Sequence, residues 1–300
     1  MNSKALVIAS LAADSLALGA HWIYDTARIK REFGQIKTLQ QPPNDSYHPN
    51  RNKGEFTHYG DQTLVLLQSI CRHNGFSLEQ FSEDWQASMS AYDGYIDKAT
   101  KETLANLSAG KPVDGCGSSS TDLGGAARIA PLVYAYHKQP GKLFDYVTQQ
   151  TSFTHNHPAT ITGALTLAKI TLRVLDGNSP AKAIDLTIAE GIDDMDLDLK
   201  MRAALESIDR ESAEVIKEFG LACPISSALP GAVHLIAKYQ DDYQTAMTEN
   251  VMAGGDSAAR GLAVGMVLGA YHDLKKIPVE WLSDMKAYDT IMDLLECDQD

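Results

Sequence analysis

Apolar residues recur at intervals of three and four along most of this 300-residue chain. Such spacing places apolar side chains on one face of a helix. It predicts helices within residues 64–70, 131–137, 161–175, 199–216, 232–239 and 262–274. Sustained alternation of apolar and polar residues, which would indicate β-strands, is missing from the sequence. The pattern therefore predicts an all-α fold.

Residues that commonly begin and end helices occur at positions that fit this pattern. Starts are indicated at Asp61, His157-Pro158, Ser179-Pro180 and Asp256, and ends at Gly75, Gly110, Gly177 and Gly220. Residues 34–59 lack periodicity and are rich in Pro, Asn, Gln and His, which indicates a long surface loop. Because no internal repeat divides the chain, we expect a single domain across residues 1–300.

The apolar run at residues 5–20 has the composition of a signal peptide. Asp14 lies inside the run, however, and Leu11, Ser15 and Leu18 follow helical spacing, so we expect a buried first helix. No other stretch approaches the ~20 apolar residues that a membrane span requires. The four cysteines, Cys71, Cys116, Cys223 and Cys297, form no C-x-x-C pair. They favour a reducing, cytoplasmic setting over a disulfide framework.

The charge balance of 26 basic against 39 acidic residues gives a formal charge of −13. This field repels phosphate backbones and anionic membrane surfaces, so we expect neither nucleic acid nor membrane as a partner. An anionic small molecule is still compatible with it, because helix N-termini and single arginines supply a local positive field.

One predicted helix carries a stripe of small residues, Gly261, Gly265 and Gly269. Glycine inside a helix costs ~1 kcal/mol against alanine and is tolerated mainly where another backbone packs very close. The segment at 262–274 is therefore expected to lie at the centre of the fold. Asp256 precedes it and Asp61 precedes the helix at 64–70, and each could act simply as an N-cap.

A glycine- and serine-rich segment, residues 114–128, leads into a predicted helix. Its N–H groups and hydroxyls could cradle a diphosphate, with Arg128 as counter-charge or scaffold. The alternative is a flexible loop capped by Asp122. His155 and His157, ahead of a proline, could bind a ligand or simply satisfy local backbone groups. The ligand-binding candidates are Gly117, Ser118, Ser119, Asp122, Gly124, Arg128, His155 and His157.

Five segments in order resemble the ADP-ribosylglycohydrolase family. They are Ala13-Asp14-Ser15-Leu16-Ala17-Leu18-Gly19, Gly60-Asp61-Gln62-Thr63, Ala127-Arg128-Ile129-Ala130-Pro131, Thr154-His155-Asn156-His157-Pro158 and Gly254-Gly255-Asp256. The resemblance covers residues of about 5 to about 272. The segments at 21–25 and 255–260 look most like the branch related to jellyfish J-type crystallins. The resemblance implies a compact orthogonal multi-helix domain that uses two magnesium or manganese ions to release ADP-ribose from a side chain or small group.

The sequence departs from the family at its metal turns. The family carries Thr-Asp-Asp-Thr and Asp-Thr-Asp-Thr, whereas this chain has Gly60-Asp61-Gln62-Thr63 and Asp256-Ser257-Ala258-Ala259. Alanine side chains offer no oxygen ligand, and glutamine replaces an anion by a neutral carbonyl. The remaining candidate ligands are Asp61, Thr63, Asp256 and Ser257. We therefore expect at most one weakly held magnesium or manganese ion, and no ion at all is equally compatible with the sequence.

Two functions follow from the resemblance. The first is hydrolysis of ADP-ribosyl N- or O-glycosidic bonds, with acid and base drawn from Asp61, Asp256, Asp25 and His21. His21 and Asp25 both fall near the position of a family glutamate, and spacing does not choose between them. Asp61 and Asp256 are expected on the floor of one cleft. The second is a catalytically silent, crystallin-like protein that binds an ADP-ribose-like ligand or is purely structural.

Overall fold

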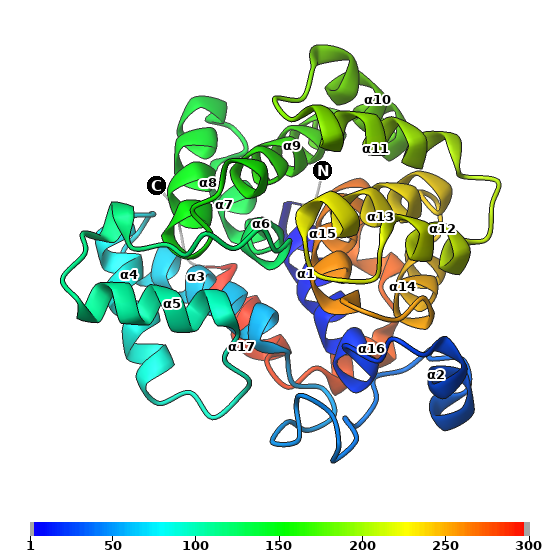
Figure 1. Cartoon of the computed structure of the whole chain (residues 1–300), viewed down its shortest axis with the longest axis horizontal. Helices are drawn as coiled ribbons and strands as arrows, with labels where there is room; N and C mark the ends of the chain where they lie inside the picture. Colours follow the sequence, from blue (N-terminus) through cyan, green and yellow to red (C-terminus); the bar gives the residue numbers. More distant parts are fainter. Residues whose placement is uncertain (1–2, 297–300) are drawn as a thin grey trace.

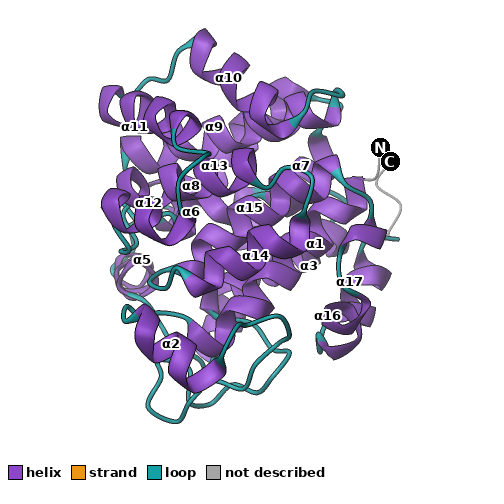
Figure 2. Cartoon of the chain, turned by 90° about the vertical axis from the view of Figure 1, so that its right-hand side faces the viewer, coloured by secondary structure: helices purple, strands orange, loops and turns teal. Residues whose placement is uncertain are grey.

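The computed structural model describes residues 3–296, and within them the chain forms helices and loops with no β-strand (Figure 2). The helices are α1 (Ser3–Ala17), α2 (Thr26–Phe33), α3 (His58–Arg72), α4 (Leu78–Ser90), α5 (Lys98–Ser108), α6 (Gly124–Ala127), α7 (Ala130–Tyr136), α8 (Pro140–Thr154), α9 (Pro158–Leu175), α10 (Pro180–Glu190), α11 (Met195–Glu206), α12 (Ser212–Phe219), α13 (Ile225–Lys238), α14 (Tyr243–Met252), α15 (Ser257–Tyr271), α16 (Val279–Asp284) and α17 (Tyr288–Leu294), with short 3₁₀ turns at Leu18–Ala20, Val113–Gly115 and Leu274–Lys276. The predicted all-α class is confirmed.

Helices α1 and α15 pack against each other at the centre, surrounded by α3, α7, α9, α13 and α14 (Figure 1). A Cβ atom added at Gly265 would lie 2.6 Å from the carbonyl oxygen of Ala9, and one at Gly269 would lie 2.7 Å from that of Ala5. The glycine stripe therefore lets the two backbones touch, as the sequence predicted. Residues 3–20 are apolar enough to span a membrane, yet 89% of them are buried in the protein, which fits a core helix.

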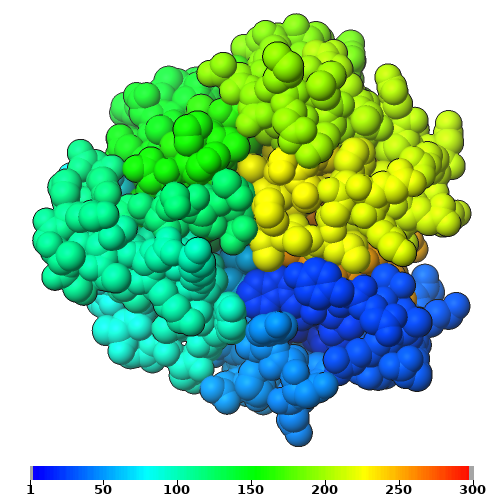
Figure 3. Space-filling view, viewed as in Figure 1, coloured from blue at the N-terminus to red at the C-terminus, as the bar shows by residue number. Residues whose placement is uncertain are grey.

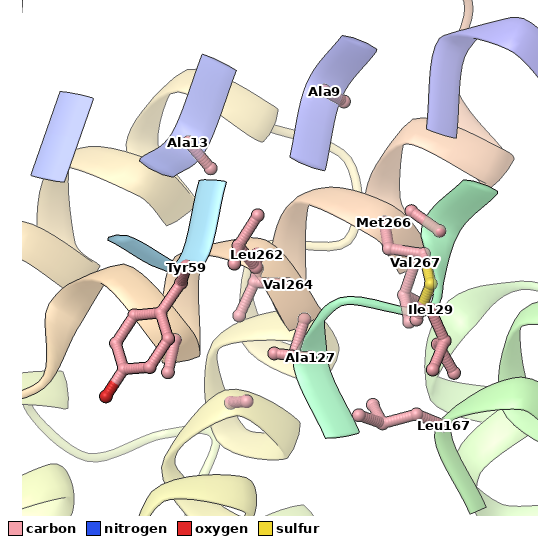
Figure 4. Close-up of a cluster of buried hydrophobic side chains, with 14 of the residues drawn as sticks. Ala9, Ala13, Tyr59, Ala127, Ile129, Leu167, Leu262, Val264, Met266 and Val267 are labelled. Atoms are coloured by element: carbon pink, nitrogen blue, oxygen red, sulfur yellow. The ribbon is translucent and has the colours of Figure 1, made fainter. Parts of the chain in front are cut away.

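A layer of apolar side chains joins α15 to its neighbours. Figure 4 shows Leu262 and Val264 of α15 close to Tyr59 of α3 and Ala127 of α6. The hydroxyl of Tyr59 points away from these apolar groups. This residue therefore links the apolar core to a polar region, which is described below.

The predicted helix at 199–216 is wrong as a single element. It consists of α11 and α12, separated by a turn in which the Arg210 N–H donates to the Ser207 carbonyl at 2.9 Å. Ser207 also turns its hydroxyl back to the Ala204 carbonyl at 2.7 Å, which competes with continuation of the helix. The last predicted helix ends at Tyr271, three residues earlier than the pattern indicated.

Most predicted helix boundaries are confirmed. Ser179, His157 and Asp256 are N-caps, and Gly75, Gly110, Gly177 and Gly220 follow helix ends with positive φ. Asp61 is the exception, because Thr57 caps α3 and Asp61 is already the fourth helical residue. Residues 34–57 form the expected long connection between α2 and α3. Cys116 and Cys223 are free thiols, whereas Cys71 is disulfide-bonded, an exception to the expected reduced state.

Candidate active site

The turn before α15 brings two distant parts of the chain together. Gly254 and Gly255 have φ of +75° and +67°, values that favour glycine. The N–H of Gly255 donates to the Ile23 carbonyl at 2.9 Å, and the N–H of Trp22 donates to the Gly255 carbonyl at 2.9 Å. These bonds hold residues 21–23 against the N-terminus of α15, where Asp256 is fully buried.

Asp256 forms a buried pair with His21. His21 Nε2 donates to Asp256 Oδ1 at 3.1 Å, and the Tyr59 hydroxyl donates to Asp256 Oδ2 at 3.3 Å. Burial acts to raise the pKa of Asp256, but the hydrogen bond from His21, helped by that from the Ala259 N–H, outweighs it and holds that pKa below its usual value. Burial lowers the pKa of His21 itself. The pair is therefore a carboxylate and a neutral imidazole.

A second histidine extends this pair. Because His21 Nε2 is the donor to Asp256, a neutral His21 accepts at Nδ1, and His48 Nε2 donates to that atom at 2.8 Å. His48 Nδ1 is buried and has no hydrogen-bond partner among the described residues. Burial lowers the pKa of His48 to about 2, so this ring is also neutral. The hydrogen-bonded chain from Asp256 through His21 to His48 therefore ends at His48 Nδ1, whose lone pair has no donor among the described residues.

Another carboxylate and imidazole lie beside the first pair. Asp97 caps α5 by accepting the Thr100 N–H at 2.6 Å, and its Oδ2 lies 3.5 Å from His58 Nε2. Burial opposes ionisation, but His58 and Thr100 hold the pKa of Asp97 below its usual range. The His58 ring stands 5.9 Å from that of His48 and 3.9 Å from that of Tyr59, centroid to centroid.

Asp122 is the third carboxylate of this region. It stands in a short backbone pairing, in which the Leu123 N–H donates to the Cys223 carbonyl at 2.8 Å and the Ile225 N–H donates to the Thr121 carbonyl at 2.7 Å. Asp122 is half-buried. Burial raises its pKa, and the charges of Asp256 and Asp97 raise it further. The Cys223 thiol hydrogen-bonds to Asp256 and helps to lower the pKa of that carboxyl. We call the cluster formed by these side chains the chamber: His21, His48, His58, Tyr59, Asp97, Asp122, Cys223 and Asp256.

Aromatic rings cover the chamber on one side. The rings of Tyr47 and Tyr95 each meet the Trp22 ring edge-on at 4.9 Å between centroids. Tyr47 is 54% exposed. In Figure 3 the blue segment near the N-terminus meets green and yellow segments from later in the chain at the middle of the face. A ligand would therefore meet aromatic faces before it reached the histidines.

Asp61 does not belong to the chamber. Its Oδ2 accepts from Arg51 Nη2 at 3.0 Å and from the Tyr92 hydroxyl at 2.6 Å. It lines a cavity of about 330 Å³ with these two residues. Among residues 3–296, no side chain hydrogen-bonds to both Asp61 and Asp256. The two carboxylates thus have separate hydrogen-bond partners, and their placement in one cleft stays a prediction.

The other metal-ligand candidates do not complete a two-ion centre. Thr63 donates its hydroxyl to the Tyr59 carbonyl at 2.8 Å, whereas Ser257 Oγ is buried and has no hydrogen-bond partner in the described structure. Gln62 Oε1 accepts from Trp85 Nε1 at 2.9 Å and from Arg128, so it is already engaged. In the part of the chain that the structure describes, no three His, Cys, Asp or Glu side chains are grouped to hold a metal ion. These residues do not fit the family's binuclear centre.

Packing explains the glycines of the 114–128 segment. A Cβ at Gly117 would lie 2.0 Å from the Ser152 carbonyl oxygen, and one at Gly124 would lie 2.2 Å from the Tyr59 ring. Glycine is thus required at both positions, whether or not a ligand lies nearby. Ser118 donates its hydroxyl to the Thr154 carbonyl at 2.7 Å, whereas Ser119 is exposed.

The remaining candidates take local roles. Arg128 is fully buried and hydrogen-bonds to Gln62 and Thr154, which fits its role as scaffold. His155 accepts or donates at Nδ1 to the Thr154 hydroxyl at 2.9 Å, and burial lowers its pKa to about 3. His157 caps α9. Asp25 is an exposed N-cap of α2, so the structure favours His21 over Asp25 as the residue that reaches the site.

Sequence reasoning missed His48, His58, Asp97 and Cys223. Two signals were available. Asp97 precedes a helix in the same way as Asp256, and His48 lies in the loop whose histidine content was noted. Neither signal says which residues these side chains would meet.

Comparisons with known proteins agree with this architecture. A family model described as ADP-ribosylglycohydrolase matches residues 3–298. Crystallins J1A and J1B of Tripedalia cystophora are 25% and 24% identical over 300 residues, covering 94% of this chain and 91% of each crystallin. An ADP-ribosyl-[dinitrogen reductase] glycohydrolase of Rhodospirillum rubrum is 25% identical over 171 residues, covering 54% of this chain and 51% of that protein. A solved structure described as an ADP-ribosylglycohydrolase-related protein complex has a TM-score of 0.70 at 20% identity, covering 98% of this chain and 95% of its own.

Proposed function

Because the chain belongs to the ADP-ribosylglycohydrolase family, we propose that its chamber binds an ADP-ribosyl group and hydrolyses the N- or O-glycosidic bond to that group. We propose further that this reaction does not need a binuclear metal centre, since Asp61 and Gln62 are engaged elsewhere and Ala258 and Ala259 have no side-chain oxygen. The single observation behind this proposal is that two buried carboxylates each lie against an imidazole, Asp256 against His21 and Asp97 against His58, with the charges of both acting on Asp122.

The unequal acidity suggests separate roles for the carboxylates. Glycosidic bond cleavage needs a carboxylic acid that protonates the leaving group and an anion that stabilises positive charge at the anomeric carbon. Burial and like charges raise the pKa of Asp122, which suits the acid. Asp256 stays ionised beside His21, which suits the anion.

The attacking water needs an acceptor for its proton. His58 has ring nitrogens without hydrogen-bond partners in the described structure, and Asp97 lies 3.5 Å from its Nε2. In the proposed step the water oxygen bonds to the anomeric carbon while the bond to the leaving group breaks. Asp122 gives its proton to the leaving group, and His58 takes one from the water.

Substrate binding would use the chamber's rim. Trp22, Tyr47 and Tyr95 offer ring faces and edges for the sugar or the base. Exposed Ser119 stays a candidate for the diphosphate. From the charge of −13 alone, we also propose that nucleic acid and membranes are not partners.

The test combines binding with turnover. Metal-stripped protein is titrated with ADP-ribose in a calorimeter, with and without magnesium, and assayed on ADP-ribosylated arginine, ADP-ribosylated serine and free ADP-ribosyl compounds. We expect binding and turnover without added metal, and at least a ~100-fold slower rate for Asp122→Asn. Asp114→Asn, an exposed carboxylate of the same segment, is the matched control and should behave as wild type.

The outcomes separate the two candidate functions. Turnover that requires two equivalents of metal would contradict the proposed metal-free reaction. ADP-ribose binding without turnover on any substrate would favour a silent relative instead. The similarity to crystallins J1A and J1B over 94% of the chain supports that second candidate.

A further inference from the structure

A buried arginine lies one helical turn after Asp256 in α15. Arg260 has no exposed surface. Its Nε donates to Asn250 Oδ1 at 3.0 Å, and its Nη2 donates to the carbonyl oxygens of Asn250 at 3.0 Å and of Gly254 at 2.8 Å. Asn250 Nδ2 in turn donates to the Ser257 carbonyl at 2.7 Å. We call these four hydrogen bonds the clasp, because they tie the end of α14 to the first turn of α15.

The clasp holds the short turn that carries Asp256 between α14 and α15. The Gly255 N–H donates to the Ile23 carbonyl at 2.9 Å, and the Asp256 N–H donates to the Leu221 carbonyl at 2.9 Å. Both of these bonds join the turn to distant segments of the chain. The bond from the arginine to the Gly254 carbonyl joins the turn to its own helix instead. The clasp therefore fixes the turn relative to the axis of α15.

The stability of the core does not by itself account for an arginine at this position. Burial of a guanidinium is unfavourable, and apolar side chains of similar volume commonly replace buried ions without loss of stability. Arg260 Nη1 has no hydrogen-bond partner in the described structure, so part of the unfavourable term is not offset. Burial lowers the pKa of Arg260 to about 10, and the charge of Asp256 acts in the opposite direction. The side chain is therefore still cationic at neutral pH.

The shape of the guanidinium does account for it. Its planar fork presents N–H donors in fixed directions, so one side chain can hold several oxygens from two segments. A Cβ added at Gly231 would lie 3.2 Å from Arg260 Cδ, so glycine in α13 leaves room for the arginine stem. We propose that Arg260 is a positioning residue, which through the clasp directs Asp256 toward His21. It acts through Asp256 and not on the substrate, and its catalytic effect rests on the hydrolysis proposed for the chamber.

The first arm of the experiment measures kinetics on ADP-ribosylated arginine. Arg260→Met keeps an apolar stem of similar length but removes the donors of the clasp. We expect kcat to fall at least ~10-fold, because a small displacement of Asp256 is enough to slow a reaction that depends on its position. KM should change by less than about threefold, because the aromatic rim of the chamber is unaltered. A folded Arg260→Met protein with the kcat of wild type would overturn the inference.

The second arm does not depend on activity. Amide hydrogen exchange is followed by NMR in wild type and in Arg260→Met. The Gly255 and Asp256 amides should exchange at least ~10-fold faster in the variant, whereas that of Leu268, deeper in α15, should stay as protected as in wild type. Unchanged exchange at Gly255 and Asp256 would overturn the inference. Faster exchange in a protein without any turnover would support the positioning of Asp256 and contradict only the proposed hydrolysis.

Arg128→Met is the matched control for the loss of a buried arginine. Arg128 is 3% exposed, and its guanidinium hydrogen-bonds to Gln62 and Thr154, away from the clasp. The exchange of the Gly255 and Asp256 amides should be the same in this variant as in wild type. Faster exchange here as well would show that the loss of any buried arginine loosens the turn, and would overturn the inference.

A second variant covers the case in which Arg260→Met does not fold. Asn250→Ala removes the other half of the clasp and should show the same fall in kcat and the same faster exchange. Wild-type values of both in Asn250→Ala would overturn the inference. Should neither variant fold, wild type decides: Gly255 and Asp256 amides that exchange as fast as the amide of exposed Ser119 would show that the turn is not held, and would equally overturn it.

Discussion

The turns before α3 and α15 look alike in sequence and differ in structure. Each has an aspartate next to glycine, ahead of an apolar helix. Asp256 caps its helix and is buried against His21. Asp61 lies one turn inside its helix and pairs with Arg51 near the surface. The turn before α15 places its carboxylate, Asp256, in the chamber. The carboxylate of the first turn of α3, Asp61, forms an ion pair with the Arg51 guanidinium instead.

The position of the N-cap explains the difference. Thr57 accepts the Tyr59 N–H at 3.2 Å, and its own hydroxyl donates to Asp14 Oδ1 at 2.6 Å. Helix α3 therefore begins at His58, and the side chain of His58, not that of Asp61, faces the chamber. A motif of a few residues indicates that a helix begins nearby, but it does not say which residue is the N-cap, and a cap three residues earlier makes Asp61 a residue of the first turn.

The largest expected effect is a difference in catalytic rate between variants of Asp256 and of Asp61. Asp256→Asn keeps the size of the side chain and much of its capping ability but removes the charge beside His21. If the chamber is hydrolytic, we expect a loss of ~100-fold or more. Asp61→Asn should change the rate by less than about threefold, although its motif alone predicts near-complete loss. Initial rates on ADP-ribosylated arginine measure both, and equal losses would show that the two residues share one site.

Stability should also distinguish the two glycines of these turns. Gly255→Ala forces a positive φ on alanine and places its Cβ 2.2 Å from the Leu221 carbonyl oxygen, so we expect a loss of ~3 kcal/mol or more. Gly60→Ala gains helix propensity, but its Cβ would lie 2.4 Å from Asp14 Oδ2, so we expect a net loss of ~1–2 kcal/mol. Urea unfolding measures both. A Gly255→Ala protein as stable as wild type would contradict the turn's rigidity.

The two turns should respond to pH in opposite directions. Near Asp61, burial raises the pKa of Asp14 to about 7, so the stability from its protonated form is lost as pH rises from about 4 to 7. In the chamber, burial lowers the pKa of His21 and His48, so stability is lost as pH falls below about 6.5, where the unfolded histidines take up protons.

Difference measurements isolate these two contributions. The free energy of unfolding is compared between wild type and Asp14→Asn, and between wild type and His48→Gln, from pH 4.5 to 8. Relative to Asp14→Asn, wild type should become less stable with rising pH, by at most ~1.4 kcal/mol per pH unit. Relative to His48→Gln, it should become less stable with falling pH. Parallel curves for either pair would contradict the corresponding assignment.

The smallest expected effect concerns Asp25. It is an exposed N-cap that accepts the Ala27 N–H at 2.9 Å. Since asparagine caps almost as well, Asp25→Asn should change stability by a few tenths of a kcal/mol. Its activity should equal that of wild type, whereas His21→Gln should lose activity because the Asp256 pair is altered. A marked loss of activity in Asp25→Asn would contradict this assignment and show that Asp25 takes part in the reaction.

The sequence alone determined the parts of the fold that depend on local spacing. The all-α class, the buried first helix, the central position of α15 and the cap at Asp256 follow from apolar residues and glycines three or four positions apart. The single helix expected at 199–216 was wrong because side-chain hydrogen bonds at Ser207 compete with the helix, and spacing does not register them.

Tertiary structure alone decided the composition of the chamber. His21 and Asp256 are 235 positions apart, and His48 reaches His21 from a loop without periodicity. Asp97 and His58 meet because α5 begins beside α3. The packing of the loop before α3 likewise determines that Asp61 pairs with Arg51 and not with a histidine of the chamber. The free energy of these contacts depends on which surfaces the packed helices bring together, and residue spacing along the chain does not contain that information.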